Sequence, residues 1–448
     1  MKSLLKTLSF GAAAVIVTVL VVATILENLF GSPFAIENIY HSPWFIALWA
    51  LLAVTATAYI LRTQRRVSLI LLHASFVVVL LGAFVSFLTS KRGDMAILQG
   101  GVPASMFEMS DGTLQKLPFR MQLADVDTKY SDNGTVSGYS ASIMADSTLH
   151  TLSLNTPVKI NGYQFCIKGV NEEGVSLLVA YDPYGRPISY LGYAMVFLSF
   201  LTLFFDRRSG FKALLYKVKG ESGKLVSTSF YLLVLSVFLC ILWYGRGVLS
   251  ATNAAEALLL LAVVLTLLAV VLRRVGQFVL LSRLLVVVAA MFFVVAALGL
   301  DDDSDVQPIL RTPLLSIHVT TIIIAYALLA CTAVNAVIAL CQKDAKRKAQ
   351  QALLGRLLLY PATMLLATGI FIGAVWANLS WGRYWGWDPK EVWALITLLV
   401  CSMGFHSHSL RFISKPVAFH IFCIVAFLAV LFTFFGVNYL LGGLHSYA

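Results

Sequence analysis

Charged residues are scarce in this sequence, and their scarcity excludes an ordinary water-soluble protein. Only 12% of the 448 residues are charged, whereas 59% are hydrophobic and the mean hydropathy is +0.84. Soluble domains average about 25% charged residues. Apolar runs of roughly 18 residues or more, long enough to cross a bilayer, recur along most of the chain. The composition therefore predicts an all-α polytopic membrane protein.

Cysteine motifs are absent as well. The six cysteines form no CxxC pair, and most of them lie inside apolar runs, where cysteine usually behaves as a small hydrophobic residue. The sequence therefore predicts neither a disulfide framework nor a thiolate metal site. A small-residue cleavage site is also missing from the first apolar run, residues 8–29, so we expect this run to be retained as the first transmembrane span.

The positive charges indicate how the chain is threaded through the membrane. A net charge of +11 could indicate a nucleic-acid partner, but the lysines and arginines cluster between the apolar runs, where they set membrane orientation. Their positions predict a cytoplasmic N-terminus and an external C-terminus, with lipid and no nucleic acid as partner. We expect about eleven transmembrane helices, near residues 8–30, 43–61, 67–89, 188–205, 226–245, 255–272, 284–300, 317–341, 357–378, 391–410 and 416–438.

One long polar segment, residues 90–187, interrupts the apolar runs. Its residues alternate between polar and apolar, and Asn-Gly and Asp-Gly pairs separate the alternating stretches. This pattern predicts a small β-rich external domain. A basic segment at 207–224 then divides the chain into residues 1–206, with four spans and the external domain, and residues 225–448, with seven spans.

The tryptophans are concentrated in residues 376–393 (WANLSWGRYWGWDPKEVW), which we call the tryptophan segment. An aromatic belt at the membrane surface would spread its indoles over many helix ends, so this density favours a platform for a large planar ligand. If the chain is helical from Trp381 to Trp385, these two indoles stack on one face. Asp388, followed by a proline and then by Glu391, predicts a capping box that opens the next helix.

Histidines inside the apolar runs are the next candidates, because an intramembrane histidine is costly and suggests function by default. His73 lies seven residues after Arg66, which places it about 10 Å into the bilayer. His406 precedes Arg411 by five residues, at a comparable depth from the same side. The two could bind one haem iron from opposite faces. Alternatively, each could bond separately to nearby backbone or hydroxyl groups.

Other histidines lie at the level of the tryptophan segment. His318 opens the eighth predicted span and His445 lies in the C-terminal tail, so both are predicted to be external. Two histidines above an indole surface are expected of a site that presents haem outside the membrane. His41, in the first external loop, is interpreted as structural. His408 and His420, near the cytoplasmic edge, are weaker candidates than the others.

Together these features resemble a known family, the System II cytochrome c synthases of the CcsBA type, in which a ResB-like half is fused to a CcsA/ResC-like half. Residues 381–388 (WGRYWGWD) are similar to the family's WWD motif, and residues 436–438 (GVN) and 443–447 (GLHSY) resemble its C-terminal signature. The resemblance to the CcsA/ResC-like half covers about residues 225–448. That to the ResB-like half covers about 1–206, with an external domain shorter than in many fused members.

The resemblance also implies roles for the candidate residues. His318 and His445 correspond to the family's external histidines, which hold the iron at the catalytic site. His73 and His406 correspond to its transmembrane pair. The haem-binding surface implied by the motif consists of Trp381, Trp385, Trp387 and Asp388, although the capping box gives Asp388 a sufficient structural task.

The activity implied by the resemblance is that of a holocytochrome c synthase, a lyase that joins haem b to the two thiols of a CxxCH segment in apocytochrome c. The implied partners are haem b, apocytochrome c and thiol-reducing thioredoxin-like proteins. The implied location is the bacterial cytoplasmic (inner) membrane, with a periplasmic active face. The chain has no CxxCH of its own, so it would be the synthase and not the substrate. Positioning of thiols against vinyl groups is expected to supply much of the rate.

Two other functions stay open. A haem exporter or carrier would hand haem to a separate ligating protein without chemistry of its own, and the WWD-type motif also resembles such proteins. A b-type electron-transfer cytochrome usually pairs histidines of one helix at a regular spacing that no predicted span shows. The presence of both halves in one chain favours the synthase, by resemblance alone.

Overall fold

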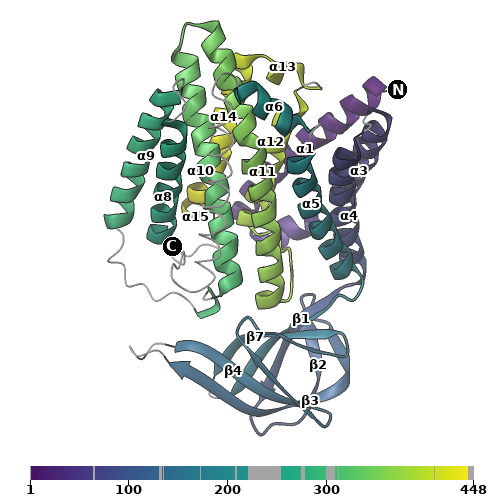
Figure 1. Cartoon of the computed structure of the whole chain (residues 1–448). Helices are drawn as coiled ribbons and strands as arrows, with labels where there is room; N and C mark the ends of the chain where they lie inside the picture. Colours follow the sequence, from purple (N-terminus) through teal and green to yellow (C-terminus); the bar gives the residue numbers. More distant parts are fainter. Residues whose placement is uncertain are drawn as a thin grey trace.

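The structure is a helical bundle with a β-sheet domain at one end (Figure 1). It is a computed structural model, and it describes residues 2–63, 66–130, 134, 136–171, 173–206, 209–219, 254–273, 278–298, 308–310, 312–407 and 409–441. The predicted span 226–245 lies outside the described residues. So do His408 and His445.

Nine helices of the described part are long and apolar enough to cross a membrane. This confirms the predicted class, an all-α polytopic membrane protein. The long helices are α1 (Lys2–Phe30), α3 (Pro43–Thr63), α4 (Val67–Thr89), α5 (Gly185–Phe205), α8 (Ala254–Arg273), α9 (Val279–Leu298), α10 (Pro313–Cys341), α11 (Ala345–Trp381) and α14 (Pro416–Leu431). Shorter helical elements connect them: α2 (Ser32–Ala35), η1 (Ile36–Tyr40), α6 (Gly210–Lys219), η4 (Pro308–Leu310), α13 (Arg411–Ser414), η6 (Phe432–Gly436) and α15 (Val437–Leu440).

The predicted span 391–410 is shorter than expected. The α-helix here, α12 (Pro389–Met403), has 15 residues, and a 3-10 turn, η5 (Gly404–His406), follows it. His406 therefore lies on this turn and not within the α-helix. At 1.5 Å per residue α12 is about 22 Å long, less than the roughly 30 Å hydrocarbon core of a bilayer.

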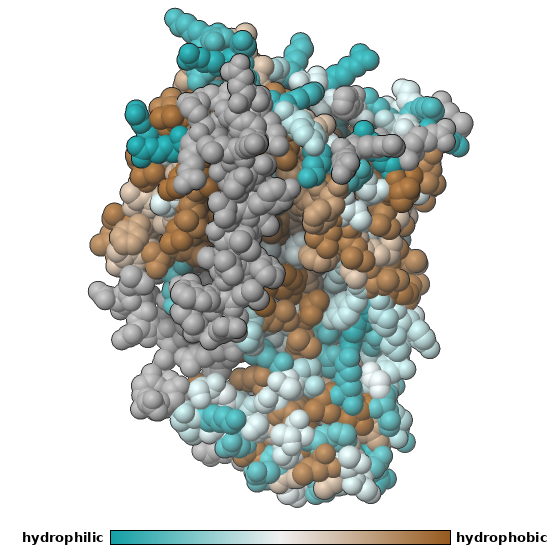
Figure 2. Space-filling view, viewed as in Figure 1, coloured by the Kyte–Doolittle hydropathy of each residue, from teal (hydrophilic) through white to brown (hydrophobic). Residues whose placement is uncertain are grey.

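Hydrophobic residues form a band around the bundle. In Figure 2 apolar side chains cover its middle, and hydrophilic side chains gather at the end far from the sheet and over the sheet domain. Many of the hydrophilic residues at the far end are cations of α6, α13 and the start of α11. This distribution is what a multi-pass membrane protein needs.

Residues 91–181 form a single antiparallel sheet of eight strands, which we call the sheet domain. This confirms the predicted β-rich domain. The strand order is β5-β4-β3-β2-β1-β8-β7-β6, and the sheet curls so that β5 also contacts β6 and β7 around an apolar core. The strands are β1 (Lys91–Leu98), β2 (Ala104–Met109), β3 (Leu114–Tyr130), β4 (Val136–Ala145), β5 (Thr148–Ser153), β6 (Val158–Ile160), β7 (Tyr163–Asn171) and β8 (Gly174–Tyr181).

Small residues bring the two helices that carry the sheet domain close together. β1 directly follows α4, and α5 directly follows β8. A Cβ atom on Gly82 would collide with Ser189, and one on Gly185 would collide with Ser86. Small residues at such contacts let transmembrane helix backbones approach closely. The sheet domain is therefore held on the bundle by a tightly packed α4–α5 pair.

The N-terminal and C-terminal parts of the chain share a hydrophobic core. Residues of α1 and α3, among them Leu20 and Phe45, pack with Val392 and Ile396 of α12. A hydrogen bond from Trp393 Nε1 to the Thr24 hydroxyl, 3.2 Å long, crosses the same contact. These contacts therefore fix the N-terminal part of the chain against the C-terminal part.

Candidate functional site

A cavity of about 2830 Å³ separates the two parts of the chain. Helices α1, α3, α4 and α5 line one side, and α11 and α12 line the other. Single-ligand pockets usually measure about 300–1,000 Å³, so the cavity has room for a large ligand in more than one position. It extends from His73 and His406 at one end to Trp385 and Trp387 at the other.

His73 and His406, predicted as partners, meet on the cavity wall. Their ring centroids lie 6.1 Å apart, and the ring planes are inclined by 88°. The Phe10 ring of α1 packs edge-on against His406 at 5.4 Å and helps to fix that ring. The structure therefore brings together two histidines from the two halves of the chain, which we call the histidine pair.

Hydrogen bonds fix the tautomer of both rings. Nδ1 of His73 lies 2.8 Å from the Leu69 carbonyl oxygen, and Nδ1 of His406 lies 3.0 Å from that of Ser402. A carbonyl oxygen can only accept a hydrogen bond, so each Nδ1 carries the proton and donates it. Each Nε2 therefore keeps its lone pair, as a metal-binding histidine requires.

The spacing of the histidine pair suits one metal ion between the rings. An imidazole nitrogen binds a first-row metal at about 2.0–2.1 Å, and its ring centre lies about 1 Å further out, so two rings on opposite sides of one ion have centres about 6 Å apart. The observed 6.1 Å agrees with this distance. The alternative expectation, separate bonds to nearby backbone groups, is also met, because Nδ1 of each ring bonds to a carbonyl oxygen four residues earlier.

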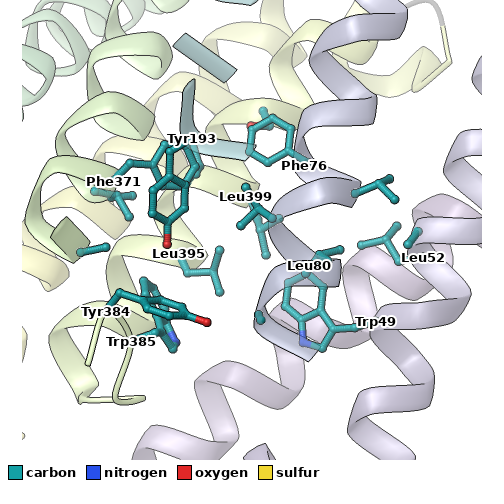
Figure 3. Close-up of a pocket in the computed structure, with 18 of the residues that line it drawn as sticks. Trp49, Leu52, Phe76, Leu80, Tyr193, Phe371, Tyr384, Trp385, Leu395 and Leu399 are labelled. Atoms are coloured by element: carbon teal, nitrogen blue, oxygen red, sulfur yellow. The ribbon is translucent and has the colours of Figure 1, made fainter. Parts of the chain in front are cut away.

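Aromatic side chains line the cavity between its two ends. Tyr193 of α5 and Phe371 of α11 are stacked, with centroids 4.5 Å apart and planes inclined by 16°. In Figure 3 they face Phe76 of α4 across the cavity, with Trp49 of α3 nearer the tryptophan segment. Residues of α4 that line the cavity run from Ser68 to Phe87, so the cavity follows this helix for about 28 Å at 1.5 Å per residue.

The tryptophan segment does not form one flat platform. Helix α11 ends at Trp381, because Gly382 adopts a left-handed conformation with φ of 68°. The expected helical stacking of Trp381 on Trp385 is therefore wrong. Trp381 instead packs edge-on against Trp376, with ring centroids 4.8 Å apart.

Trp385 and Trp387 lie at right angles to each other. Their centroids are 5.9 Å apart and their planes are inclined by 89°. Trp387, with φ of 59°, stacks on Tyr40 of η1 at 4.6 Å with nearly parallel planes. Tyr40 thus covers one face of Trp387, while Trp385 lies on the cavity wall beside Tyr384 (Figure 3).

The stacking of Tyr40 on Trp387 leads to a prediction about stability. Tyr40 is 2% exposed, and its hydroxyl has no hydrogen-bond partner among the residues that the structure describes. Tyr40→Phe should therefore leave stability unchanged or raise it. Tyr40→Ala should cost about 3–5 kcal/mol, the usual cost of deleting a buried aromatic ring. Size-exclusion chromatography of heated, detergent-solubilised protein measures both effects, and equal midpoints for the wild type and Tyr40→Ala would contradict the prediction.

The capping box predicted at Asp388 is confirmed. The Asp388 carboxylate accepts a hydrogen bond from the Lys390 backbone N–H at 2.9 Å. The Glu391 carboxylate accepts from the backbone N–H groups of Asp388, at 3.3 Å, and Gly386, at 2.7 Å. These bonds satisfy N–H groups that a helix start leaves unpaired. Together they fix the loop that carries Trp385 and Trp387.

A second set of hydrogen bonds fixes the same loop to α4 and the end of α11 to the sheet domain. The Tyr384 hydroxyl donates to the Ser86 hydroxyl, which donates to Asp182 at 2.6 Å. Gln164 of β7 donates to the Asn378 carbonyl oxygen at 2.6 Å. All of these side chains are buried. The loop is therefore held by α4, by the sheet domain and by its own helix.

His318, predicted as an external iron ligand, lies beside the cavity but is not one of the described residues that line it. Its Nδ1 is 2.7 Å from the Gly369 carbonyl oxygen, and its ring packs against Gly373 of α11. This bond leaves Nε2 with a lone pair, as in the histidine pair. Its predicted partner, His445, lies outside the described residues. The predicted pairing of these two histidines therefore stays a prediction.

The remaining histidines differ in position. His41, interpreted from the sequence as structural, lines the cavity near Trp387 and packs edge-on against Phe87. Burial and the nearby Arg92 lower the pKa of His41, which favours its neutral form. His420 is fully buried, with Nε2 3.1 Å from the Lys348 carbonyl oxygen, and is not part of the cavity wall.

Several residues of this end of the cavity could not be identified from the sequence. Tyr40, Ser86 and Arg92 come from the N-terminal part of the chain and meet the tryptophan segment only in the fold. Nothing in the sequence marks them, because each is an ordinary residue near the end of a helix or strand. Gly382 is the exception, because a glycine after a helix is a recognised stop signal.

These features define a class: a multi-pass membrane protein with a large aromatic cavity between its halves and a histidine pair in the cavity wall. Comparison with known families identifies it further. Residues 62–184 match the ResB-like family, and residues 251–445 match the cytochrome c assembly protein family. The chain therefore joins a ResB-like domain and a cytochrome c assembly domain, as is consistent with a fused CcsBA-type protein of System II.

Curated relatives agree with these families. The chain is 48% identical over 84 residues to the protein NrfI of Wolinella succinogenes, a match covering 19% of the chain and 9% of NrfI. It is 39% identical over 155 residues to the cytochrome c biogenesis protein CcsA of Chlamydomonas reinhardtii, covering 32% of the chain and 43% of that protein. The matching segments thus span less than half the length of these relatives. The similarity supports a place in cytochrome c biogenesis.

Proposed function

We propose that this protein moves haem b across the membrane and attaches it covalently to the CxxCH thiols of an apocytochrome c. The observation that carries the proposal is the histidine pair, on the wall of a cavity that continues to the tryptophan segment. A haem iron with two axial imidazoles matches the spacing and tautomers of His73 and His406. The two matched families support a task in cytochrome c assembly.

In this proposal the sheet domain and the tryptophan segment face the periplasm, and the histidine pair lies toward the cytoplasm. The cations at the far end of the bundle support this orientation, because cytoplasmic loops carry the excess of lysine and arginine. They include Lys212 of α6, Lys346 and Arg347 at the start of α11, and Arg411 of α13. The protein would then lie in the bacterial cytoplasmic membrane with its active face outside.

Haem would occupy two positions in turn. His73 and His406 hold the iron first, and the stacked rings of Tyr193 and Phe371 give the porphyrin an apolar path outward. At the outer position Trp385 contacts the ring, while His318 and His445 hold the iron. The histidine of the CxxCH substrate then displaces one of them and helps the product to leave.

The chemical step is the addition of two thiols to the two vinyl groups of haem. In each addition the S–H bond and the π bond of the vinyl group break, and one C–S and one C–H bond form. No net electron transfer occurs, so this chain has to supply orientation more than reactive groups. The loop that carries Trp385 and Trp387 can supply this orientation. It cannot shift without losing its hydrogen bonds to Glu391 and Ser86.

Co-expression with an apocytochrome c tests the proposal. The chain is produced with a CxxCH apocytochrome in a cell lacking other maturation factors, and the cytochrome is extracted with acid acetone. We expect haem to stay on the polypeptide through extraction and denaturing electrophoresis. An apocytochrome with both cysteines replaced by serine is the control and should lose its haem. If the CxxCH substrate also loses its haem, the protein is a carrier and not a synthase.

A further inference from the structure

Two arginines face the cavity near the tryptophan segment. Arg92 is the second residue of β1, and Arg383 lies two residues after the end of α11. Both line the cavity, and both are partly buried. Burial lowers the pKa of Arg92, and the charges of Arg383 and Arg186 lower it further. Tyr384 and Asp182 act in the opposite direction and raise it. Two cations from distant parts of the sequence therefore line one cavity, and the hydrogen bond between Tyr384 and Ser86 brings their chain segments together.

Neither arginine has a carboxylate partner among the described residues. The ion pairs in that part of the chain join Lys168 to Asp94 and Arg347 to Asp344. Asp182 is the acid whose charge raises the pKa of Arg92. Its carboxylate already accepts hydrogen bonds from the Ser86 hydroxyl and from the Gly185 backbone N–H. Within the described part of the chain, Arg92 Nε is buried without a hydrogen-bond partner. A buried cation without a partner is unfavourable, so Arg92, with a second cation, Arg383, on the wall of the same cavity, is suited to an anion.

The surrounding structure holds the Arg383 guanidinium in place and ties its loop to the helix that leads to Arg92. Arg383 packs against the backbone of Gly386, where a Cβ atom would lie 2.7 Å from its Cζ atom. Tyr384, the next residue, is bonded to Ser86 of α4, five residues before the start of β1 at position 91. Arg92 and Arg383 are thus connected through one short, buried contact. Preorganised guanidinium groups bind carboxylates well, because they offer two parallel N–H donors.

We propose that Arg92 and Arg383 bind the two carboxylates of a flat dianionic ligand whose ring lies against Trp385. The inference rests on the proposed function, in which this ligand is haem b, with its two propionates on one edge of the porphyrin. The arginines then determine which edge of the porphyrin points toward the sheet domain. They also select for a porphyrin with free carboxylates over one without them.

Haem and its dimethyl ester distinguish the carboxylates from the rest of the porphyrin. Each ligand is titrated into the purified full-length protein and followed by absorption spectroscopy, in a His73→Ala, His406→Ala background that leaves only the outer position. We expect haem to bind at least tenfold more tightly than the ester, since the ester lacks the charged carboxylates to which the guanidinium groups donate. Arg92→Gln with Arg383→Gln should abolish this preference.

Arg120→Gln is the matched control, because Arg120 is exposed on β3 and does not line the cavity. It should keep the preference for haem. Equal binding of haem and its ester by the His73→Ala, His406→Ala protein with both arginines intact would overturn the dicarboxylate site and leave the proposed function standing. This outcome holds even if the arginine variant folds poorly. Absence of haem binding in the background variant, with binding in the wild type, would also overturn the dicarboxylate site. Absence of haem binding in the wild type would overturn the proposed function as well.

Discussion

Replacing both His73 and His406 by alanine is expected to remove the haem bound at the inner position of this protein. Each ring is oriented by a hydrogen bond from Nδ1 to a backbone carbonyl, which leaves Nε2 to bind iron. Loss of even a supporting partner of a metal ligand lowers metal affinity about 10- to 100-fold. Loss of both ligands should therefore lower the haem content of this position more than about tenfold. Absorption spectra of equal amounts of membrane-extracted protein measure the effect.

His420→Ala is the control for this prediction. His420 is buried and bonded to a backbone carbonyl, like the histidine pair, but it does not line the cavity. Its replacement should leave the haem spectrum unchanged. A normal spectrum in the His73→Ala, His406→Ala variant would remove the histidine pair from haem binding, and an equal loss in all variants would indicate a general effect of removing a buried histidine.

Replacing His318 or His445 by alanine is expected to stop cytochrome c maturation while the protein remains inserted in the membrane. In the proposed function these residues hold the iron while the thiols add. Added imidazole should restore maturation, because free imidazole can occupy the vacated axial position of the iron. The yield of covalent cytochrome, with and without imidazole, is the measurement.

The packing of His318 provides a second variant for the same prediction. A Cβ atom on Gly373 would lie 2.6 Å from Cε1 and Nδ1 of the His318 ring, so Gly373→Ala must displace that ring. We expect Gly373→Ala to lower maturation without removing any ligand. Unchanged maturation in the His318→Ala and His445→Ala variants would exclude both residues from the mechanism.

The fold class could be predicted because hydrophobic length is a strong signal. Apolar runs long enough to span a bilayer, and polar alternation in 90–187, predicted both the helical bundle and the sheet domain. The early end of α12 was missed although Gly404 directly follows Met403, because the apolar run up to Met403 and Phe405 beyond the glycine were counted as one span. Strand order and the curl of the sheet depend on contacts between strands far apart in the sequence.

The candidate site could be predicted only in part. Counting residues from the cytoplasmic cations gave the depths of His73 and His406, but which side of its helix each faces depends on packing. The capping box at Asp388 is a local pattern and was therefore predictable. The arrangement of the tryptophans was not, because Gly382 ends α11 and Tyr40, from another helix, stacks on Trp387.

Electron paramagnetic resonance of the ferric, haem-loaded protein tests the histidine pair most directly. A His318→Ala, His445→Ala background leaves only the inner position with two ligands. Backbone hydrogen bonds hold the two imidazole planes at 88°. Crossed planes leave the iron d orbitals nearly degenerate, so we expect a strongly anisotropic low-spin signal that disappears in the His73→Ala, His406→Ala variant. A high-spin signal, or a low-spin signal that survives the loss of both histidines, would contradict the proposed haem site.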